Sequence, residues 1–148
     1  MIVGIATDHN GVNEKQVLID YIKENGIEVV DYSPINTDTD DYPDYAKKVA
    51  TAVKNGQIMQ GILMCGTGIG MSIAANKVKG IRAAKVSSVD EARLAKEHNN
   101  ANIVCLSYKE DMDKLKEMIL TFIKTEFSNE ERHVRRVAKI GEIENDQV

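Results

Sequence analysis

Five short apolar runs alternate with helical stretches along the chain, and this alternation most limits the folds that the chain can adopt. The runs lie at residues 2–6, 27–32, 58–65, 81–86 and 102–106. Between them, apolar residues recur at the three- and four-residue spacing of amphipathic helices. Strands that are joined by helices pair in parallel and carry helices on both faces of the sheet. We therefore predict an α/β fold with a five-stranded parallel sheet.

Local signals place the helix ends, and connection rules suggest the strand order. Gly26 stands where a helix ends, Pro43 opens a helix, and Ser88 begins a capping box. Right-handed crossovers and the common order 2-1-3-4-5 put the switch point between the first and third strands. We expect a three-layer, Rossmann-like (flavodoxin-like) domain spanning residues 1–148. An extra C-terminal helix at about residues 129–143 follows the last strand and its helix.

Composition and charge exclude several classes of protein. The 148 residues, 43% of them hydrophobic and 28% charged, suit one globular domain. A net charge of −4 argues against wholesale nucleic-acid binding. No apolar run approaches the length of a membrane span, and no N-terminal signal pattern is present. We expect a cytoplasmic protein that has neither a membrane nor a nucleic-acid partner.

A cysteine and a glycine-rich loop follow the third apolar run. Cys65 ends the run, and glycines occupy alternate positions after it, at Gly66, Gly68 and Gly70. The backbone N–H groups of such a loop can converge on a small oxyanion. Cys65 is either a buried core thiol or a base or nucleophile, and the turn that follows favours its thiolate form. The hydroxyl of Thr67 can donate to that thiolate or to a substrate.

The chain also offers polar groups that lie away from the glycine loop in sequence. Asp8 and His9 follow the first strand, so the predicted topology sets them across a crevice from Cys65. They either cap a loop or act on a ligand. The three histidines show no HxxH or HExxH spacing, so we expect no metal site. The fourth strand of the predicted order separates Cys65 from Cys105, which disfavours a disulfide.

Two further groups lie near the ends of the fourth and last helices. His98 and Asn99 end the fourth helix, whose direction carries them to the opposite end of the sheet from Cys65. If His98 is catalytic, it serves a neighbouring subunit. The last helix carries a basic stripe at positions i, i+3, i+4 and i+7, made by Arg132, Arg135, Arg136 and Lys139. This stripe is either a solvated face or a phosphate-binding cluster.

A set of motifs occurs in a fixed order along the chain. They are Asp8-His9, Tyr42-Pro43, Cys65-Gly66-Thr67-Gly68-x-Gly70 with Ser72-Ile73-Ala74-Ala75-Asn76-Lys77, Gly80-Ile81-Arg82-Ala83, His98-Asn99-x-Ala101-Asn102 and Arg132-His133-x-x-Arg136-Val137. Over its whole length the chain resembles the B-type ribose-5-phosphate isomerases, within a sugar-phosphate isomerase family that includes galactose-6-phosphate isomerase. The resemblance implies an aldose–ketose isomerase without metal or cofactor that acts through a cis-enediolate. It also implies a homodimer or tetramer with shared sites, on which the C-terminal helix packs against a neighbouring subunit.

The resemblance assigns catalytic roles by position. Cys65 is the base that moves a proton between C1 and C2 of the sugar, and Thr67 assists it. His98, supplied by the adjacent subunit, helps to open the furanose ring. The N–H groups that hold the enediolate oxygens belong to the loop residues Gly66, Gly68, Ile69 and Gly70.

The remaining positions of the resemblance contact a small phosphorylated aldose or ketose. Asp8, His9, Tyr42 and Asn99 bind sugar hydroxyls or assist ring opening. Arg132 and Arg136 bind the phosphate. The family's phosphate-binding arginine after the fifth strand is replaced here by Lys109, which keeps the charge but loses the bidentate fork.

Three functions stay open at this point. An isomerase of ribose 5-phosphate and ribulose 5-phosphate leads. The first alternative is the same chemistry on a hexose 6-phosphate such as allose or galactose 6-phosphate. The second is a sugar-phosphate-binding module without catalysis, and the presence of both Cys65 and His98 in one chain argues against it.

Overall fold

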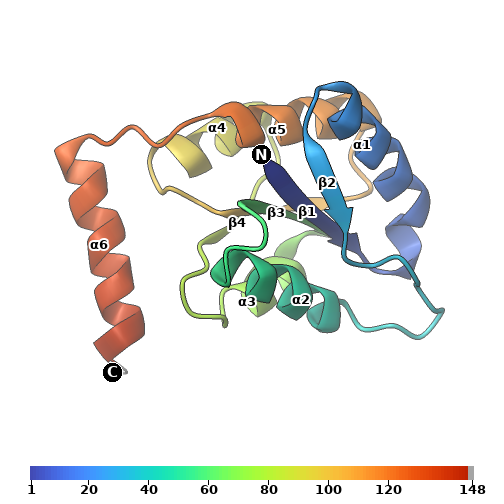
Figure 1. Cartoon of the computed structure of the whole chain (residues 1–148), viewed down its shortest axis with the longest axis horizontal. Helices are drawn as coiled ribbons and strands as arrows, with labels where there is room; N and C mark the ends of the chain where they lie inside the picture. Colours follow the sequence, from blue (N-terminus) through green and yellow to red (C-terminus); the bar gives the residue numbers. More distant parts are fainter. Residues whose placement is uncertain (147–148) are drawn as a thin grey trace.

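A parallel sheet lies between two layers of helices in the computed structural model, which describes residues 1–146 (Figure 1). The strands are β1 (Ile2–Thr7), β2 (Glu28–Asp31), β3 (Gln60–Cys65), β4 (Ala83–Lys85) and β5 (Ile103–Ser107). The helices are α1 (Val12–Glu24), α2 (Tyr42–Lys54), α3 (Ile69–Ala75), α4 (Val89–Glu97), α5 (Met112–Lys124) and α6 (Glu131–Asp146). A short 3₁₀ turn, η1 (His9–Gly11), joins β1 to α1. The predicted α/β class is confirmed.

The two faces of the sheet are covered by different helices. Helices α1, α4 and α5 cover one face, and α2 and α3 cover the other (Figure 1). Phe122 of α5 and Leu18 of α1 are fully buried in the first layer, and Val49 of α2 is fully buried in the second. This two-sided burial explains why the strands read as apolar runs without alternation.

The predicted strand order is wrong in its last two positions. The observed order is β2-β1-β3-β5-β4, with every pair parallel. Strand β5 lies inside because its residues Ile103 to Leu106 are buried on both faces, whereas β4 has only three residues, none fully buried, and ends at Lys85. Short strands that carry lysine are typical of sheet edges.

The correction leaves the predicted switch point in place. Strands β1 and β3 are neighbours, with Thr7 paired to Met64. The chain winds outward to β2 on one side of β1 and to β3 on the other. Asp8 and Cys65, which directly follow these paired residues, therefore lie together at the carboxyl end of the sheet.

The two cysteines lie closer than predicted, because β3 and β5 are direct neighbours. Leu63 pairs with Cys105 and Cys65 pairs with Ser107, so the thiols are offset by two positions along adjacent strands. Both cysteines are buried and free, although no strand separates them. Burial raises the pKa of the Cys105 thiol, with a smaller contribution from Cys65. Cys105 is therefore an inert core residue.

Helix α6 stands apart from the two layers (Figure 1). It begins two residues later than predicted and extends past residue 143. Val134, Ile140 and Ile143 are exposed on it, and its Glu144 accepts a hydrogen bond of 2.8 Å from the N–H of Gly80. Within residues 1–146, none of the helices has both the length and the apolar character needed to cross a membrane. Residues 147 and 148 of the predicted domain lie outside the described part.

Candidate active site

Cys65 ends β3 and is the first residue of the candidate site. Its thiol is 5% exposed and accepts a hydrogen bond of 3.2 Å from the N–H of Gly68. The N–H of Ile69 donates to the hydroxyl of Thr67, 3.1 Å away. Two N–H groups that the sequence assigned to substrate oxygens are thus bound to the loop's own side chains. They keep the sulfur and the hydroxyl at fixed positions.

The shape of the loop depends on glycine at two of its positions. Gly68 has φ +79°, and a Cβ there would lie 3.1 Å from the backbone of Leu106. A Cβ on Gly70 would lie 2.5 Å from the ring of Tyr42. Gly68 therefore allows the loop to press against β5, and Gly70 allows the aromatic ring of Tyr42 to cover the loop.

Asp8 and His9 begin the turn that follows β1, as predicted. The carboxylate of Asp8 accepts a hydrogen bond of 3.0 Å from the N–H of Asn10, which is loop capping. The ring of His9 instead reaches the loop between β2 and α2. Its Nδ1 lies 2.7 Å from Asp40 Oδ1. Both side chains lie at the carboxyl end of the sheet, where Cys65 also lies.

Asp40 lies in the polar loop between β2 and α2, yet its side chain is largely buried. Its carboxylate is only 7% exposed. Burial on its own would raise the pKa of Asp40, but hydrogen bonds from Asn36, His9 and Tyr45 outweigh burial and hold that pKa well below its usual range. The sequence contains no signal for this, because Asn36, His9 and Tyr45 lie on a loop, a turn and a helix that only the folded chain brings around Asp40.

Ser107 and Tyr108 are two site residues that sequence reasoning missed. Ser107 Oγ donates a hydrogen bond of 2.7 Å to the carbonyl oxygen of Gly66, which ties the glycine loop to β5. The Tyr108 hydroxyl lies 3.6 Å from the position of a Cβ on Gly66. Burial raises the pKa of the Tyr108 phenol, and the nearby Asp8 and Cys65 raise it further. The phenol therefore lies near both of these residues, at the carboxyl end of the sheet.

Lys109 and Tyr42 lie at the same end of the sheet as Cys65. Lys109 follows Tyr108 and is exposed, and its backbone N–H donates to Ser107 Oγ at 3.2 Å. Tyr42 begins α2 with 39% of its surface exposed. The structure thus brings together the following predicted site residues: Asp8, His9, Tyr42, Cys65, Gly66, Thr67, Gly68, Ile69, Gly70 and Lys109.

His98 and Asn99 lie at the amino end of the sheet, as their helix direction predicted. His98 caps the carboxyl end of α4, and its ring lies 4.3 Å from the ring of His133, measured between centroids. His133 is buried, and its Nδ1 lies 2.6 Å from Ser128 Oγ. Burial lowers the pKa of His133, and the neighbouring His98, Arg132 and Arg136 lower it further. Within one chain, His98 cannot reach Cys65.

The arginines of α6 are exposed, and acidic residues neutralise part of their charge. Arg132 pairs with Glu130 at 2.7 Å and Arg135 with Glu131 at 2.7 Å. Acidic side chains therefore lie beside part of the basic stripe. Of the two predicted phosphate ligands, Arg136 makes no ion pair with any residue that the structure describes. Neither arginine lies with Cys65 in a single chain.

A buried lysine holds the amino end of the sheet together. Lys96 Nζ donates to Gln60 Oε1 at 3.0 Å and to the carbonyl oxygen of Phe122 at 3.2 Å. Burial lowers the pKa of Lys96 to about 8. The bond to the carbonyl oxygen of Phe122 caps the last turn of α5. Lys96 itself lies two residues before His98 in the sequence. Residues 1–146 contain no group of three or more His, Cys, Asp or Glu side chains arranged to hold a metal ion.

Comparison with known proteins places this arrangement in a family. The family model described as Ribose/Galactose Isomerase matches residues 3–140. The chain belongs to the ribose/galactose isomerase family. A "Probable ribose-5-phosphate isomerase B" of Mycoplasma genitalium is 45% identical over 140 residues, which cover 92% of this chain and 91% of that protein.

Solved structures of similar proteins share the fold and the length of this chain. Ribose-5-phosphate isomerase B of Clostridium thermocellum has a TM-score of 0.94 and 46% identity, and all of each chain is covered. The Mycoplasma genitalium enzyme, solved with bound ribulose-5-phosphate, has a TM-score of 0.91 and 41% identity over 97% of this chain and 96% of that one. The chain is therefore an isomerase, an intramolecular oxidoreductase with a Rossmann-like fold.

Proposed function

We propose that this isomerase interconverts ribose 5-phosphate and ribulose 5-phosphate by proton transfer through a cis-enediolate. One observation carries the proposal. Cys65 lies at the carboxyl end of the sheet beside Asp8, in a chain that matches ribose-5-phosphate isomerase B over its full length. A related structure that holds ribulose-5-phosphate supports the choice of sugar. The composition further suggests a cytoplasmic enzyme of carbohydrate metabolism.

The chemistry follows from the groups that surround the sulfur. The Cys65 thiolate removes the proton from C2 of the open-chain aldose and returns it to C1. Thr67 lies two residues away and supports the thiolate or a substrate oxygen. The negative charge that develops on the enediolate oxygens is stabilised by N–H groups of the glycine loop. Those of Gly68 and Ile69 leave their present acceptors, Cys65 Sγ and Thr67 Oγ1, as the substrate binds.

The test is turnover of ribose 5-phosphate by the full chain and by Cys65→Ala. We expect kcat to fall by about 10³-fold or more with KM little changed, because the base acts in the transition state rather than in binding. Cys105→Ala is the matched control, because that thiol is also buried but lies in the core. Solvent deuterium at C2 of recovered ribose 5-phosphate separates catalysis from binding. A Cys65→Ala enzyme with near-normal kcat contradicts the role of Cys65.

Hexose 6-phosphates are the second candidate substrates, because the family model covers both ribose and galactose isomerases. Lys109, which is exposed at the carboxyl end of the sheet, stands where the resemblance expects arginine. We expect kcat/KM to be higher for ribose 5-phosphate than for allose or galactose 6-phosphate. A higher value for either hexose phosphate reassigns the substrate and leaves the role of Cys65 unchanged.

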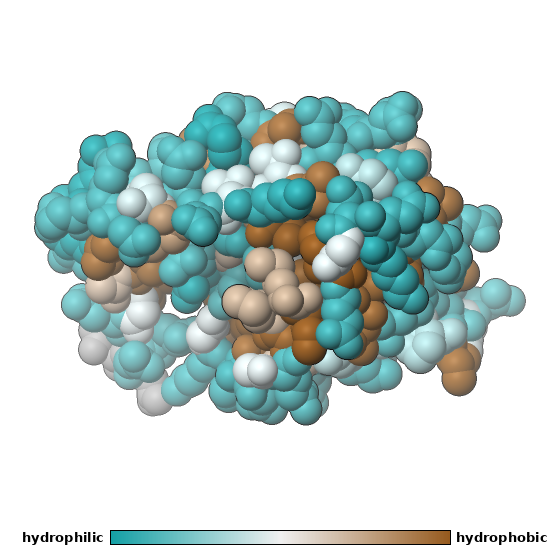
Figure 2. Space-filling view, turned by 45° about the horizontal axis from the view of Figure 1, so that its top comes forward, coloured by the Kyte–Doolittle hydropathy of each residue, from teal (hydrophilic) through white to brown (hydrophobic). Residues whose placement is uncertain are grey.

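A complete site further requires a second copy of the chain. His98 and the arginines of α6 lie at the opposite end of the sheet from Cys65, so a neighbouring subunit supplies them in a homodimer or a tetramer. A groove of about 770 Å³ separates α6 from the open edge of β4, and Ile81, Ile140 and Ile143 are among its lining residues. In Figure 2, hydrophobic side chains gather in the middle of one face inside a rim of hydrophilic ones. These exposed apolar surfaces suit contacts between copies.

A further inference from the structure

We propose that Asp40 is the positioning residue of His9: it holds the imidazole ring with Nδ1–H toward the carboxylate and so turns Nε2 away from it, at the end of the sheet where Cys65 lies. The proposal rests on the function proposed above, because it assigns the orientation of a residue expected to contact the sugar. The residues that carry it come from three separate segments: the turn after β1, the loop between β2 and α2, and the first turns of α2.

The two oxygens of Asp40 have different partners. Oδ1 accepts two hydrogen bonds from His9, one from the backbone N–H at 3.1 Å and one from Nδ1 at 2.7 Å. Oδ2 accepts from the Tyr45 hydroxyl at 2.8 Å, from Asn36 Nδ2 at 2.9 Å and from the N–H of Thr37 at 3.3 Å. One oxygen therefore holds the histidine, and the other holds the loop that carries the carboxylate.

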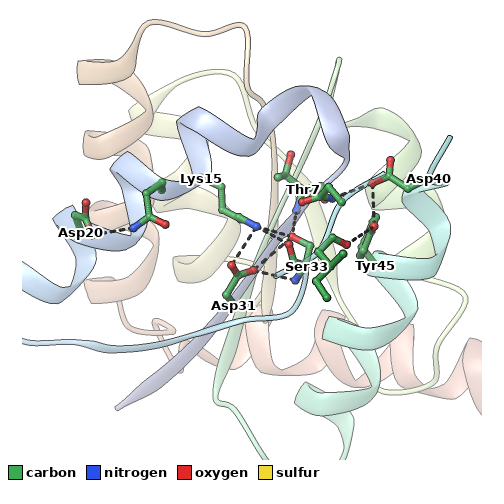
Figure 3. A network of polar contacts seen from close by, with 10 residues as sticks. Thr7, Lys15, Asp20, Asp31, Ser33, Asp40 and Tyr45 are labelled. Atoms are coloured by element: carbon green, nitrogen blue, oxygen red, sulfur yellow. Dashed lines mark hydrogen bonds and ion pairs between the residues drawn. The ribbon is translucent and has the colours of Figure 1, made fainter. Parts of the chain in front are cut away.

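The loop is itself attached to the end of β1. Asn36 Nδ2 also donates to the carbonyl oxygen of Thr7 at 3.0 Å, and the N–H of Thr7 donates to Ser33 Oγ at 3.0 Å. Figure 3 shows this arrangement, with Asp40 joined to Tyr45 and with Lys15 between Asp31 and Ser33. Lys15 Nζ lies 3.1 Å from Asp31 Oδ2 and 2.6 Å from the carbonyl oxygen of Ser33. Both backbone groups of the residue before Asp8 are thus bound by the loop that supplies Asp40.

The chemistry of the pair sets which nitrogen of His9 is available. An ionised carboxylate only accepts hydrogen bonds, so Nδ1 must carry the proton that lies between the two groups. Nε2 is then the nitrogen that accepts a proton when the ring is neutral and donates one when it is charged. Within residues 1–146, no hydrogen bond or ion pair occupies Nε2, and about a third of the side chain is exposed. A substrate oxygen can therefore reach it.

The charges that face His9 favour its protonated form. The hydrogen bond to Asp40 raises the pKa of His9, against the lowering effect of burial, and the negative charges of Asp40, Asp8 and Asp38 raise it further. Asp40 itself stays ionised throughout the physiological range, because its pKa is held well below its usual range. The raised pKa of His9 favours a ring that offers a positively charged N–H to an oxygen of the sugar phosphate.

Asp40→Asn is the variant that tests the proposal. Two fixed donors, Asn36 Nδ2 and the Thr37 N–H, face Oδ2, and only one, the His9 N–H, faces Oδ1. The amide oxygen therefore takes the place of Oδ2, and the amide NH₂ faces His9. An NH₂ group needs an acceptor, so the neutral ring must change to the tautomer with hydrogen on Nε2. We expect the pKa of His9 to fall and kcat/KM to fall by at least about tenfold, with the loss greatest at neutral and higher pH.

Tyr45→Phe is the matched control. It removes one bond to Oδ2 and leaves both bonds from His9 to Oδ1 intact. Histidine ring ¹⁵N spectra without substrate report tautomer and titration directly, and only three histidines must be assigned. We expect Tyr45→Phe to keep the wild-type tautomer and pKa of His9. If Asp40 only orders its loop, both variants lose activity alike and the His9 titration does not move in either.

Several results would overturn the assignment. In the wild type, a neutral His9 ring with hydrogen on Nε2 contradicts it without any variant, so the test does not depend on whether Asp40→Asn folds. An unchanged His9 titration in Asp40→Asn contradicts it too, as does a kcat/KM equal to that of the wild type. A wild type without ribose 5-phosphate turnover instead contradicts the proposed function, and the spectra still decide the orientation of His9.

Discussion

Cys65 and His98 lie at opposite ends of one sheet, and their surroundings differ. At the carboxyl end, the polar groups around Cys65 are held by partners from the same chain: Gly68 N–H holds the sulfur, Ser107 holds the loop and Asp40 holds His9. At the amino end, the ring of His98 lies against the tilted ring of His133, a residue of α6, and that helix stands apart from the two layers. The first region is organised within one chain, whereas the second presents groups outward.

This difference shows which part of the candidate site one chain holds in place by itself. Cys65 and its loop are held by hydrogen bonds within the chain, from the Gly68 N–H and the Ser107 hydroxyl. His98 and the arginines of α6 are placed where only another molecule can use them. Three further predictions examine this contrast, beginning with the largest expected effect.

Mixing two inactive variants tests whether the two ends of the sheet meet across subunits. We expect Cys65→Ala and His98→Ala to be nearly inactive alone. After subunit exchange, about a quarter of the wild-type activity should return, because half of the dimers are mixed and each has one intact site. The measurement is ribose 5-phosphate turnover after co-refolding. A mixture of either variant with the double variant is the control, and a mixture that stays inactive contradicts the shared site.

Replacing one glycine at each end of the sheet compares how tightly the two ends are packed. Gly68→Ala should destabilise the chain by about 2–4 kcal/mol, because a positive φ and a contact with the β5 backbone both oppose a Cβ. Gly80 precedes β4 with φ +86°, but it has open space around it. Gly80→Ala should therefore cost only about 1 kcal/mol. Urea unfolding measures both, and equal costs contradict a tightly built carboxyl end.

Lys96→Met isolates a buried charge at the amino end. The pKa of Lys96 is about 8 in the folded chain and 10.5 ordinarily. Between these values the unfolded chain binds more protons, so Lys96 contributes stability that is present above pH 10.5 and is lost as the pH falls through 8. We expect the free energy of unfolding of the wild type, relative to Lys96→Met, to rise by about 2 kcal/mol between pH 8 and pH 10. A flat difference contradicts the burial of the charged amine.

Much of the fold was readable from local patterns. Pro43 lies in the first turn of α2, Gly26 follows α1 with φ +77°, and Ser88 accepts a hydrogen bond from the N–H of Glu91. Each of these signals works within one helical turn, so the sequence carries it whole. Local signals also placed Cys65 and its loop directly after a buried strand. They likewise placed His98 at the carboxyl end of its helix.

The sequence also contains a signal for the strand order, which is the difference in apolar character between β4 and β5. Strand β4 reads Ala-Ala-Lys and follows Arg82, whereas β5 reads Ile-Val-Cys-Leu. The more apolar strand belongs inside the sheet and the shorter, charged one at its edge. The common order 2-1-3-4-5 places β4 inside the sheet, whereas this comparison of apolar character predicts the observed order, with β4 at the edge.

The sequence by itself determined the alternation of strands and helices, the switch point between β1 and β3, and the cysteine with its glycine loop, because spacing, apolar pattern and connection rules specify each of them. Only the tertiary structure decided that Asp40 is buried against His9 and that Ser107 holds Gly66. These bonds join segments that are 31 and 41 positions apart. Their existence depends on how whole layers pack, and a short polar side chain looks the same in sequence whether it faces water or a partner.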